Sequence, residues 1–338
     1  MIVVMNPSCT AEHTDNVVAL LDRMGLTGCV IEGASQKVVE VLGGNGEVDP
    51  TALQNAPMVD RVLDSAEPIL AGSRKPDEDT AALPIGATAV LGGKKLGIIA
   101  GPCAVESRDQ LLDIAHAVKD AGAVALRGGA YKPRTSPYSF QGHAQKGLEW
   151  LAEAREQTGL AIVTEVMRCE HVPRVAEFAD VLQIGSRNMH HTHLLATVGK
   201  QSKPVLLKRG WCSTVDEFLS SAEYIMLAGN RNVILCERGI RTHETYVRNT
   251  LALAVVPELK RRSILPVVVD PSHGTGHDYL VTPMSNAAVA CGADGLLIEV
   301  HSNPSRAWSD GCQSLDLKQF ASLMAGLEPI AQACGREL

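Results

Sequence analysis

The spacing of hydrophobic and polar positions changes near residue 88. From there, short apolar runs rich in β-branched residues alternate with longer amphipathic stretches. The spacing at 109–121, 214–227 and 280–291 predicts helices. The runs predicted as strands cover residues 97–100, 123–126, 161–164, 181–184, 204–207, 233–235, 266–269 and 295–298. Eight strand–helix units in roughly 240 residues predict a (β/α)8 TIM barrel, with a doubly wound open sheet as the alternative.

The first 70 residues follow the pattern of a small α+β unit. Apolar runs predict strands, and the spacing of residues 12–24 predicts a helix. Asp49 and Pro50 supply an N-cap and a first-turn proline for a second, short helix. The order βαββαβ indicates a ferredoxin-like domain, with strands expected at residues 2–5, 28–32, 38–42 and 59–63.

A polar, proline-containing stretch separates the two patterns. Residues 71–87 include the run from Ser73 to Thr80, which is rich in charged residues and poor in apolar ones. Such a composition is typical of a linker that permits movement. We therefore expect a ferredoxin-like domain at 1–70, a linker at 71–87 and a catalytic barrel at 88–338.

Composition narrows the classes of partner. The 338-residue chain has a formal net charge of −7, whereas a nucleic-acid-binding surface usually shows a basic excess. No apolar run is long enough to predict a membrane span, and the N-terminus lacks the features of a signal peptide. The nine cysteines show no CxxC spacing. We expect a cytoplasmic protein without disulfides that binds neither nucleic acid nor membrane.

Basic residues follow the predicted barrel strands, at the rim where such barrels hold their active sites. Any one of them alone would be read as a solvated surface charge. Together they predict a ligand with more than one phosphate or carboxylate, because guanidinium and ammonium groups bind such anions. These residues are Arg127, Lys132, Arg134, Arg187, Lys208 and Arg238.

Four residues at the same rim could bind a metal: Cys103, His273, Glu299 and Asp310. One thiolate, one imidazole and two carboxylates suit one divalent transition metal, such as Mn, Fe, Co or Zn, better than Mg. The alternatives are a small buried thiol at Cys103 and a hydrogen-bonded loop histidine at His273. A second histidine group is expected to lie on the surface, at His190, His191 and His193.

The rim residues stand in a collinear series of segments: AGPCAVES, LRGGAYKPRTSPYSFQG, QIGSRNM, LLKRG, LCERGIRT, VVDPSHGTG and LIEVH followed by SDGCQSL. Over about residues 95–330 this series closely resembles 3-deoxy-D-arabino-heptulosonate 7-phosphate (DAHP) synthase of the type I beta subclass. The first domain resembles, more loosely, the ferredoxin-like regulatory domain of some members. The family fold is a (β/α)8 barrel.

The resemblance implies a role for each matching residue. The metal ligands would be Cys103, His273, Glu299 and Asp310. The phosphoenolpyruvate clamp would be Arg127, Lys132, Arg187, Lys208 and Arg238. The cradle of the aldose phosphate would be Lys132, Pro133, Arg134, Thr135 and Ser136. Further substrate contacts are expected from Gln183, Gly185, Ser186, Glu237, His273 and Asp310.

The implied reaction is a metal-dependent, aldol-type condensation of phosphoenolpyruvate with erythrose 4-phosphate, the first step of the shikimate pathway. Lys132 is the candidate proton donor and Glu165 a candidate for orienting water. A related synthase that uses arabinose 5-phosphate carries a KANRSS-like segment where this chain has KPRTS, so we favour erythrose 4-phosphate. An aromatic amino acid as feedback ligand and a homotetramer are expected from the same resemblance.

Two positions depart from the family pattern. Residues 274–278 read GTGHD, where many relatives have a more basic stretch that ends in Arg. Cys312 follows Asp310 by two residues, where Gln or Ala is more usual. Nearness in sequence leaves open whether the Cys312 thiol approaches Cys103.

Overall fold

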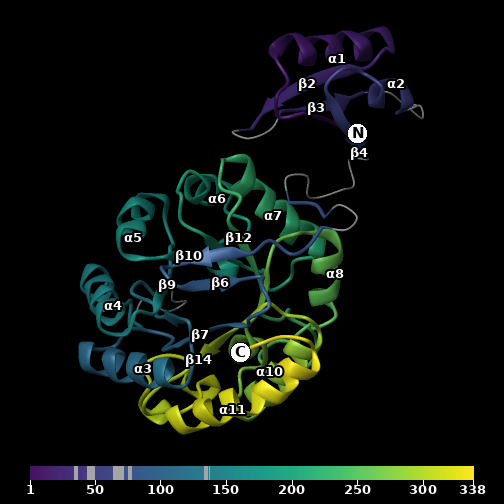
Figure 1. Ribbon diagram of the computed structural model, residues 1–338. Helices are drawn as coiled ribbons and strands as arrows, with labels where there is room; N and C mark the ends of the chain where they lie inside the picture. Colours follow the sequence, from purple (N-terminus) through teal and green to yellow (C-terminus); the bar gives the residue numbers. More distant parts are fainter. Residues whose placement is uncertain (34–36, 44–49, 64–71, 75–77, 133–135, 137) are drawn as a thin grey trace.

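The computed structural model contains a small N-terminal domain and a large barrel (Figure 1). It describes residues 1–33, 37–43, 50–63, 72–74, 78–132, 136 and 138–338. In Figure 1 the small domain stands apart from the ring of helices that surrounds the barrel. No helix among the described residues is long and apolar enough to cross a membrane.

The small domain has the predicted βαββαβ order, which confirms the ferredoxin-like fold. Its antiparallel sheet has the strand order β2-β3-β1-β4. Val3 and Met5 of the first strand pack in one core with Val17 and Leu21 of the first helix, whereas Val4 joins a smaller cluster. The elements are β1 (Ile2–Met5), α1 (Ala11–Arg23), β2 (Thr27–Glu32), β3 (Lys37–Leu42), α2 (Thr51–Gln54) and β4 (Val59–Leu63).

Part of the predicted linker 71–87 is built into the barrel. The main chain of Arg74 donates to Arg262, at 3.0 Å, and Ala81 donates to Ile264, at 2.7 Å. Two short strands, β5 (Leu83–Ile85) and β6 (Ala89–Leu91), then pair as a hairpin. Their side chains share a core with the interior of the barrel. The hairpin thus closes the end of the barrel opposite the candidate site.

One glycine shows how closely this hairpin approaches the barrel. Gly86, in the turn between β5 and β6, has a φ of +61°. A Cβ atom added there would lie 2.8 Å from the Cβ of Ala161, at the start of a barrel strand. A larger residue would therefore be strained in its backbone and would clash with the barrel.

The eight predicted barrel strands are confirmed, and they close into a parallel barrel. Their interiors are apolar because both faces are buried, one against the helices and one inside the barrel. They are β7 (Gly97–Gly101), β8 (Ala125–Arg127), β9 (Ala161–Glu165), β10 (Val181–Ile184), β11 (Val205–Lys208), β12 (Val233–Glu237), β13 (Val267–Val269) and β14 (Gly295–Glu299).

Helices surround the barrel strands in Figure 1. The three predicted at 109–121, 214–227 and 280–291 are confirmed as α3, α7 and α10, with ends shifted by one or two residues. The helices are α3 (Arg108–Asp120), α4 (Gln145–Thr158), α5 (Val172–Phe178), α6 (Thr192–Gly199), α7 (Val215–Leu227), α8 (Val255–Arg262), α9 (Pro271–Thr275), α10 (Asp278–Ala290) and α11 (Leu317–Ala333). Four short 3-10 turns are η1 (Cys169–His171), η2 (Ser186–Asn188), η3 (Pro304–Arg306) and η4 (Gly311–Gln313).

Candidate active site

A cavity of about 350 Å³ opens at the carboxyl ends of the barrel strands. Its lining is strongly polar and includes many of the residues that the sequence placed at this rim. The lining residues are Arg127, Lys132, Ser136, Ser139, Glu165, Gln183, Gly185, Ser186, Arg187, Lys208, Trp211, Arg238, Arg248, His273 and Asp310. Five of the six predicted cations thus meet in one cavity. The sixth, Arg134, lies outside the described residues, as do Pro133 and Thr135.

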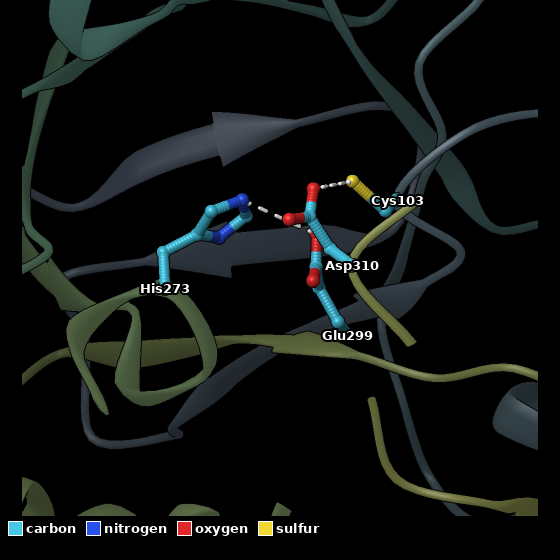
Figure 2. Close-up of side chains that lie close together, drawn as sticks. All are labelled: Cys103, His273, Glu299 and Asp310. Atoms are coloured by element: carbon cyan, nitrogen blue, oxygen red, sulfur yellow. Dashed lines mark hydrogen bonds and ion pairs between the residues drawn. The ribbon is translucent and has the colours of Figure 1, made fainter. Parts of the chain in front are cut away.

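The four candidate metal ligands come together (Figure 2), and two of them, His273 and Asp310, line this cavity. Their ligand atoms all lie within 4.8 Å of one another. The Cys103 thiol donates to Asp310 Oδ2 at 2.9 Å, and His273 Nε2 lies 3.3 Å from Glu299 Oε1. Cys103 follows β7, His273 lies in α9, Glu299 ends β14, and Asp310 precedes η4. The prediction that residues after the barrel strands share one rim therefore identified neighbours that are far apart in sequence.

The chemistry of this donor set fits a divalent transition metal. His273 Nδ1 is engaged with Asp270 Oδ2 at 2.7 Å, which leaves Nε2 directed toward the cluster. Such a carboxylate–histidine pair is the usual way in which proteins orient a metal-binding imidazole. Burial lowers the pKa of His273, so the imidazole is neutral and able to bind a metal at pH 7.

The acidic members of the cluster differ in protonation. Burial, and next the charge of Glu299, raise the pKa of the Cys103 thiol to about 12. Burial by itself would raise the pKa of Glu299, but its interactions with His273 and Arg127 outweigh burial and hold that pKa below its ordinary value. A metal that displaces the thiol proton would therefore find one thiolate, one imidazole and carboxylate oxygen atoms.

The buried cations of the cavity are matched by buried acceptors. Arg127 Nη1 lies 2.6 Å from Glu299 Oε1, and Lys208 pairs with Asp270. Lys132 Nζ donates to the main-chain oxygen and to the sulfur of Cys103, at 2.9 and 3.0 Å. Burial opposes the charge of Arg127, yet the neighbouring Glu299 and Cys103 raise its pKa above the ordinary value. These pairs keep positive charge inside the barrel.

Two other arginines present their guanidinium groups differently. Arg238 donates to the main-chain oxygens of Gly239 and His273, at 3.3 and 3.4 Å. Burial lowers its pKa, although the guanidinium stays charged at neutral pH. Arg187 is exposed and lies over the ring of Trp211, 5.8 Å from the ring centre. Both guanidinium groups can therefore bind an anion in the cavity.

Glu165 and Gln183 also face the cavity. Burial raises the pKa of Glu165, and the charges of Lys132 and Lys208 counter this only in part. A carboxyl group whose pKa is raised by burial can exchange a proton with a bound molecule. The structure therefore places Glu165 in the wall of the cavity.

Some candidates lie elsewhere. Glu237 is fully buried, pairs with Arg209 at 2.9 Å, accepts from the main chain of Gly239 at 2.7 Å and is not among the cavity-lining residues. Cys312 is exposed, whereas Cys103 is buried, and Cys312 is not part of the four-residue cluster. His190, His191 and His193 are exposed, as predicted for surface residues.

Sequence reasoning missed several residues that shape the site. Asp270 holds both Lys208 and His273. Arg248 and Gln313 contact the candidate ligands, and Trp211 lies beneath Arg187. Asp270 was detectable, because it directly follows a predicted strand and precedes His273 by three residues. The others lie outside the predicted strands and helices, where spacing does not predict side-chain direction.

Comparison with known proteins identifies the family of this chain. The sequence model of the DAHP synthetase I family matches residues 81–333, and that of the DAHP synthase ferredoxin-like domain matches residues 1–64. Phospho-2-dehydro-3-deoxyheptonate aldolase of Thermotoga maritima is 44% identical over 335 residues, which cover 99% of each chain. The 2-dehydro-3-deoxyphosphooctonate aldolase of Caulobacter vibrioides is 35% identical over 264 residues, 72% of this chain and 91% of that protein.

Solved structures give the same result. The crystal structure of phospho-2-dehydro-3-deoxyheptonate aldolase (DAHP synthase) from Thermotoga maritima has a TM-score of 0.80 at 43% identity and covers 99% of this chain and 98% of its own. A truncated form of 3-deoxy-D-arabino-heptulosonate 7-phosphate synthase from Thermotoga maritima has a TM-score of 0.73 at 45% identity, over 79% of this chain and 97% of its own. The resemblance seen in the sequence is confirmed: the chain is an enzyme that belongs to the DAHP synthetase I family and carries the ferredoxin-like domain of DAHP synthases.

Proposed function

We propose that the cavity condenses phosphoenolpyruvate with erythrose 4-phosphate and releases phosphate, which makes this protein a 3-deoxy-7-phosphoheptulonate synthase at the first step of the shikimate pathway. One observation carries the proposal: six cationic side chains, five of them predicted from the sequence, line a single cavity beside a cluster of four metal-binding side chains. Two anionic substrates and one divalent metal account for both features. Family membership supports the same reaction.

Phosphoenolpyruvate is assigned to the inner part of the cavity. Arg127, Lys132 and Lys208 are buried there, and they contact Glu299, Cys103 and Asp270, respectively. Arg238 and Arg187 offer guanidinium groups for the phosphate and the carboxylate. The cavity is also lined by three uncharged residues, Gln183, Gly185 and Ser186.

The aldose phosphate is assigned to the segment from Lys132 to Ser136. Ser136 lines the cavity, and Lys132 reaches the metal cluster, with its Nζ 3.0 Å from Cys103 Sγ. Pro133, Arg134 and Thr135 complete the segment in sequence. Arg134 would hold the phosphate of the aldose with a charge-assisted pair of hydrogen bonds.

In the proposed reaction, C3 of phosphoenolpyruvate attacks the aldehyde carbon of erythrose 4-phosphate. A divalent metal bound by Cys103, His273, Glu299 and Asp310 would act as a Lewis acid toward the aldehyde. Lys132 donates a proton to the aldehyde oxygen as it becomes a hydroxyl. Glu165 orients the water that adds at C2, after which phosphate leaves and the new ketone forms.

Phosphate release measured with each aldose tests the proposal. The full chain, supplied with phosphoenolpyruvate and Mn²⁺, is expected to release phosphate with erythrose 4-phosphate and much more slowly with arabinose 5-phosphate. Preference for arabinose 5-phosphate would assign the chain to the related octulosonate reaction. Several relatives are named 2-dehydro-3-deoxyphosphooctonate aldolase. No release with either aldose would refute the assignment of the cavity.

The small domain is assigned a regulatory role. It supplies no residue to the cavity lining or to the metal cluster among the residues described. An aromatic amino acid that binds it would inhibit the barrel if it favoured a closed arrangement of the two domains. A homotetramer in the cytoplasm completes the proposal.

A further inference from the structure

Two residues outside the candidate metal cluster contact two of its members. Gln313 lies in η4 and is 2% exposed. Its Nε2 donates to Glu299 Oε2 at 2.6 Å, and its Oε1 accepts from Arg248 Nη1 at 2.9 Å. A buried amide that uses both ends in this way is fixed in orientation.

Arg248 continues the connection to the second carboxylate. Its Nη1 also donates to Asp310 Oδ1 at 2.9 Å. Its main-chain N–H donates to Thr275 in α9 at 2.8 Å. Arg248 is therefore connected to three of the four candidate ligands: directly to Asp310, through Gln313 to Glu299, and through α9 to His273.

Each of the two carboxylates has one oxygen that faces another member of the cluster. Asp310 gives Oδ1 to Arg248, while Oδ2 points toward Cys103, 2.9 Å from its sulfur (Figure 2). Glu299 gives Oε2 to Gln313, while Oε1 lies 3.3 Å from His273 Nε2. Asp310 is therefore held at one oxygen and presents the other to the cluster. Glu299 is held at Oε2 by Gln313, and its Oε1 faces the cluster while it also pairs with Arg127 at 2.6 Å.

The backbone of Asp310 requires such support. Its φ is +55°, a left-handed conformation that is uncommon for residues other than glycine. The negative charges of Glu299 and Asp310 also repel each other in the absence of a metal. A guanidinium bonded to one carboxylate, and an amide bonded to the other, counter this repulsion from outside the cluster.

We propose that Gln313 and Arg248 are positioning residues that hold Glu299 and Asp310 in the orientation a divalent metal needs. The inference rests on the metal site proposed above. Partners of this kind, one layer beyond the ligands, change metal affinity when they are lost, because the ligands must then be ordered at the moment of binding.

Metal binding to the full-length protein, freed of metal with a chelator, tests this role. Gln313→Met keeps the side-chain volume and removes both hydrogen bonds, so its Kd for Mn²⁺ by calorimetry is expected to rise about 10- to 100-fold. Arg248→Ala is expected to raise Kd less, roughly threefold to tenfold, because its pair with Asp310 is partly exposed. The cobalt-bound variants should also show altered absorption bands, which report the geometry around the metal.

Two matched changes serve as controls. Gln332→Met and Arg261→Ala alter exposed residues whose side chains bond to carboxylates on their own helices, away from the metal cluster. Both should keep the Kd of the unchanged protein. The melting temperature of each metal-free variant separates loss of folding from loss of metal binding. If Gln313→Met fails to fold, Arg248→Ala still tests the inference, because it changes a partly exposed side chain.

The outcomes separate this inference from the proposed function. If the unchanged protein binds no divalent metal, the proposed metal site itself is wrong. If it binds metal, and both variants keep its Kd within about twofold and its cobalt spectrum, the positioning role is overturned. An effect of Gln313→Met alone would support the role of Gln313 and overturn that of Arg248.

Discussion

The barrel rim and the small domain use buried polar groups in opposite ways. The rim buries Arg127, Lys208, Asp270 and Glu299 inside the strand ends. In the small domain, Thr14 is the buried polar side chain among the residues described, and the remaining core is aliphatic. Burying a charge costs several kcal/mol, and an apolar replacement often gives equal or greater stability. Charges kept at the rim therefore indicate chemistry, whereas the core of the small domain indicates stability alone.

The largest effect is expected from loss of the metal site. Chelation, or Cys103→Ala, should lower turnover by about a thousandfold or more, since a Lewis acid contributes several kcal/mol to such a reaction. Added Mn²⁺ should restore the chelated protein but not Cys103→Ala. The rate of phosphate release measures both. Full activity of the metal-free protein would contradict the view that the buried charges at the rim serve chemistry.

The next largest effect concerns the buried ion pairs. Arg127→Met leaves the Glu299 carboxylate without its cation, so the metal-free protein should lose about 3–5 kcal/mol of stability. Leu21→Ala in the small domain should cost a comparable 2–5 kcal/mol through a cavity. Only the first change should abolish turnover. Urea unfolding and phosphate release distinguish them, and equal losses of turnover would contradict the comparison.

Substrate preference should divide between two arginines. Arg134→Ala should raise KM for the aldose phosphate, and Arg238→Ala should raise KM for phosphoenolpyruvate. Each loss of a charge-assisted hydrogen bond is worth about 1.5–3 kcal/mol, or roughly 10- to 100-fold. Initial rates with either substrate varied test the split. Equal changes for both substrates in both variants would show that the assigned subsites are wrong.

Metal affinity should depend on pH through Cys103. The pKa of its thiol is raised to about 12, mainly by burial, so the thiol is protonated at neutral pH and must lose its proton when a metal binds. Between pH 7 and 8.5 the affinity should increase about tenfold per pH unit. His273 adds no further slope there, because its pKa is lowered and it is already neutral. Proton release on adding Mn²⁺, followed with an indicator dye, should vanish in Cys103→Ser.

The smallest effect on turnover is expected from removal of the small domain. A chain that begins near Ala82 should keep its turnover within about twofold of the full chain and lose inhibition by tyrosine or phenylalanine. A chain that begins at Gly72 is the better version, because it retains the main-chain bonds of residues 72–81 to residues 262–264. A folded but inactive short chain would show that catalysis needs the small domain.

The sequence by itself determined the barrel, the ferredoxin-like order and the location of the rim. Strands buried on both faces must be apolar, so residues 181–184 and 295–298 were readable from composition alone. Because parallel strands place their carboxyl ends at one rim, Cys103 and Glu299 could be assigned to the same site although 195 positions separate them.

Tertiary structure decided how the side chains pair. Lys208 pairs with Asp270, Glu237 turns to Arg209 and away from the cavity, and Gln313 reaches Glu299. These contacts depend on the tilt of neighbouring strands and on loop paths, which local spacing does not encode. The hairpin at 83–91 was missed for a similar reason: a three-residue strand carries too little pattern, and its burial comes from a barrel that is still distant in the sequence.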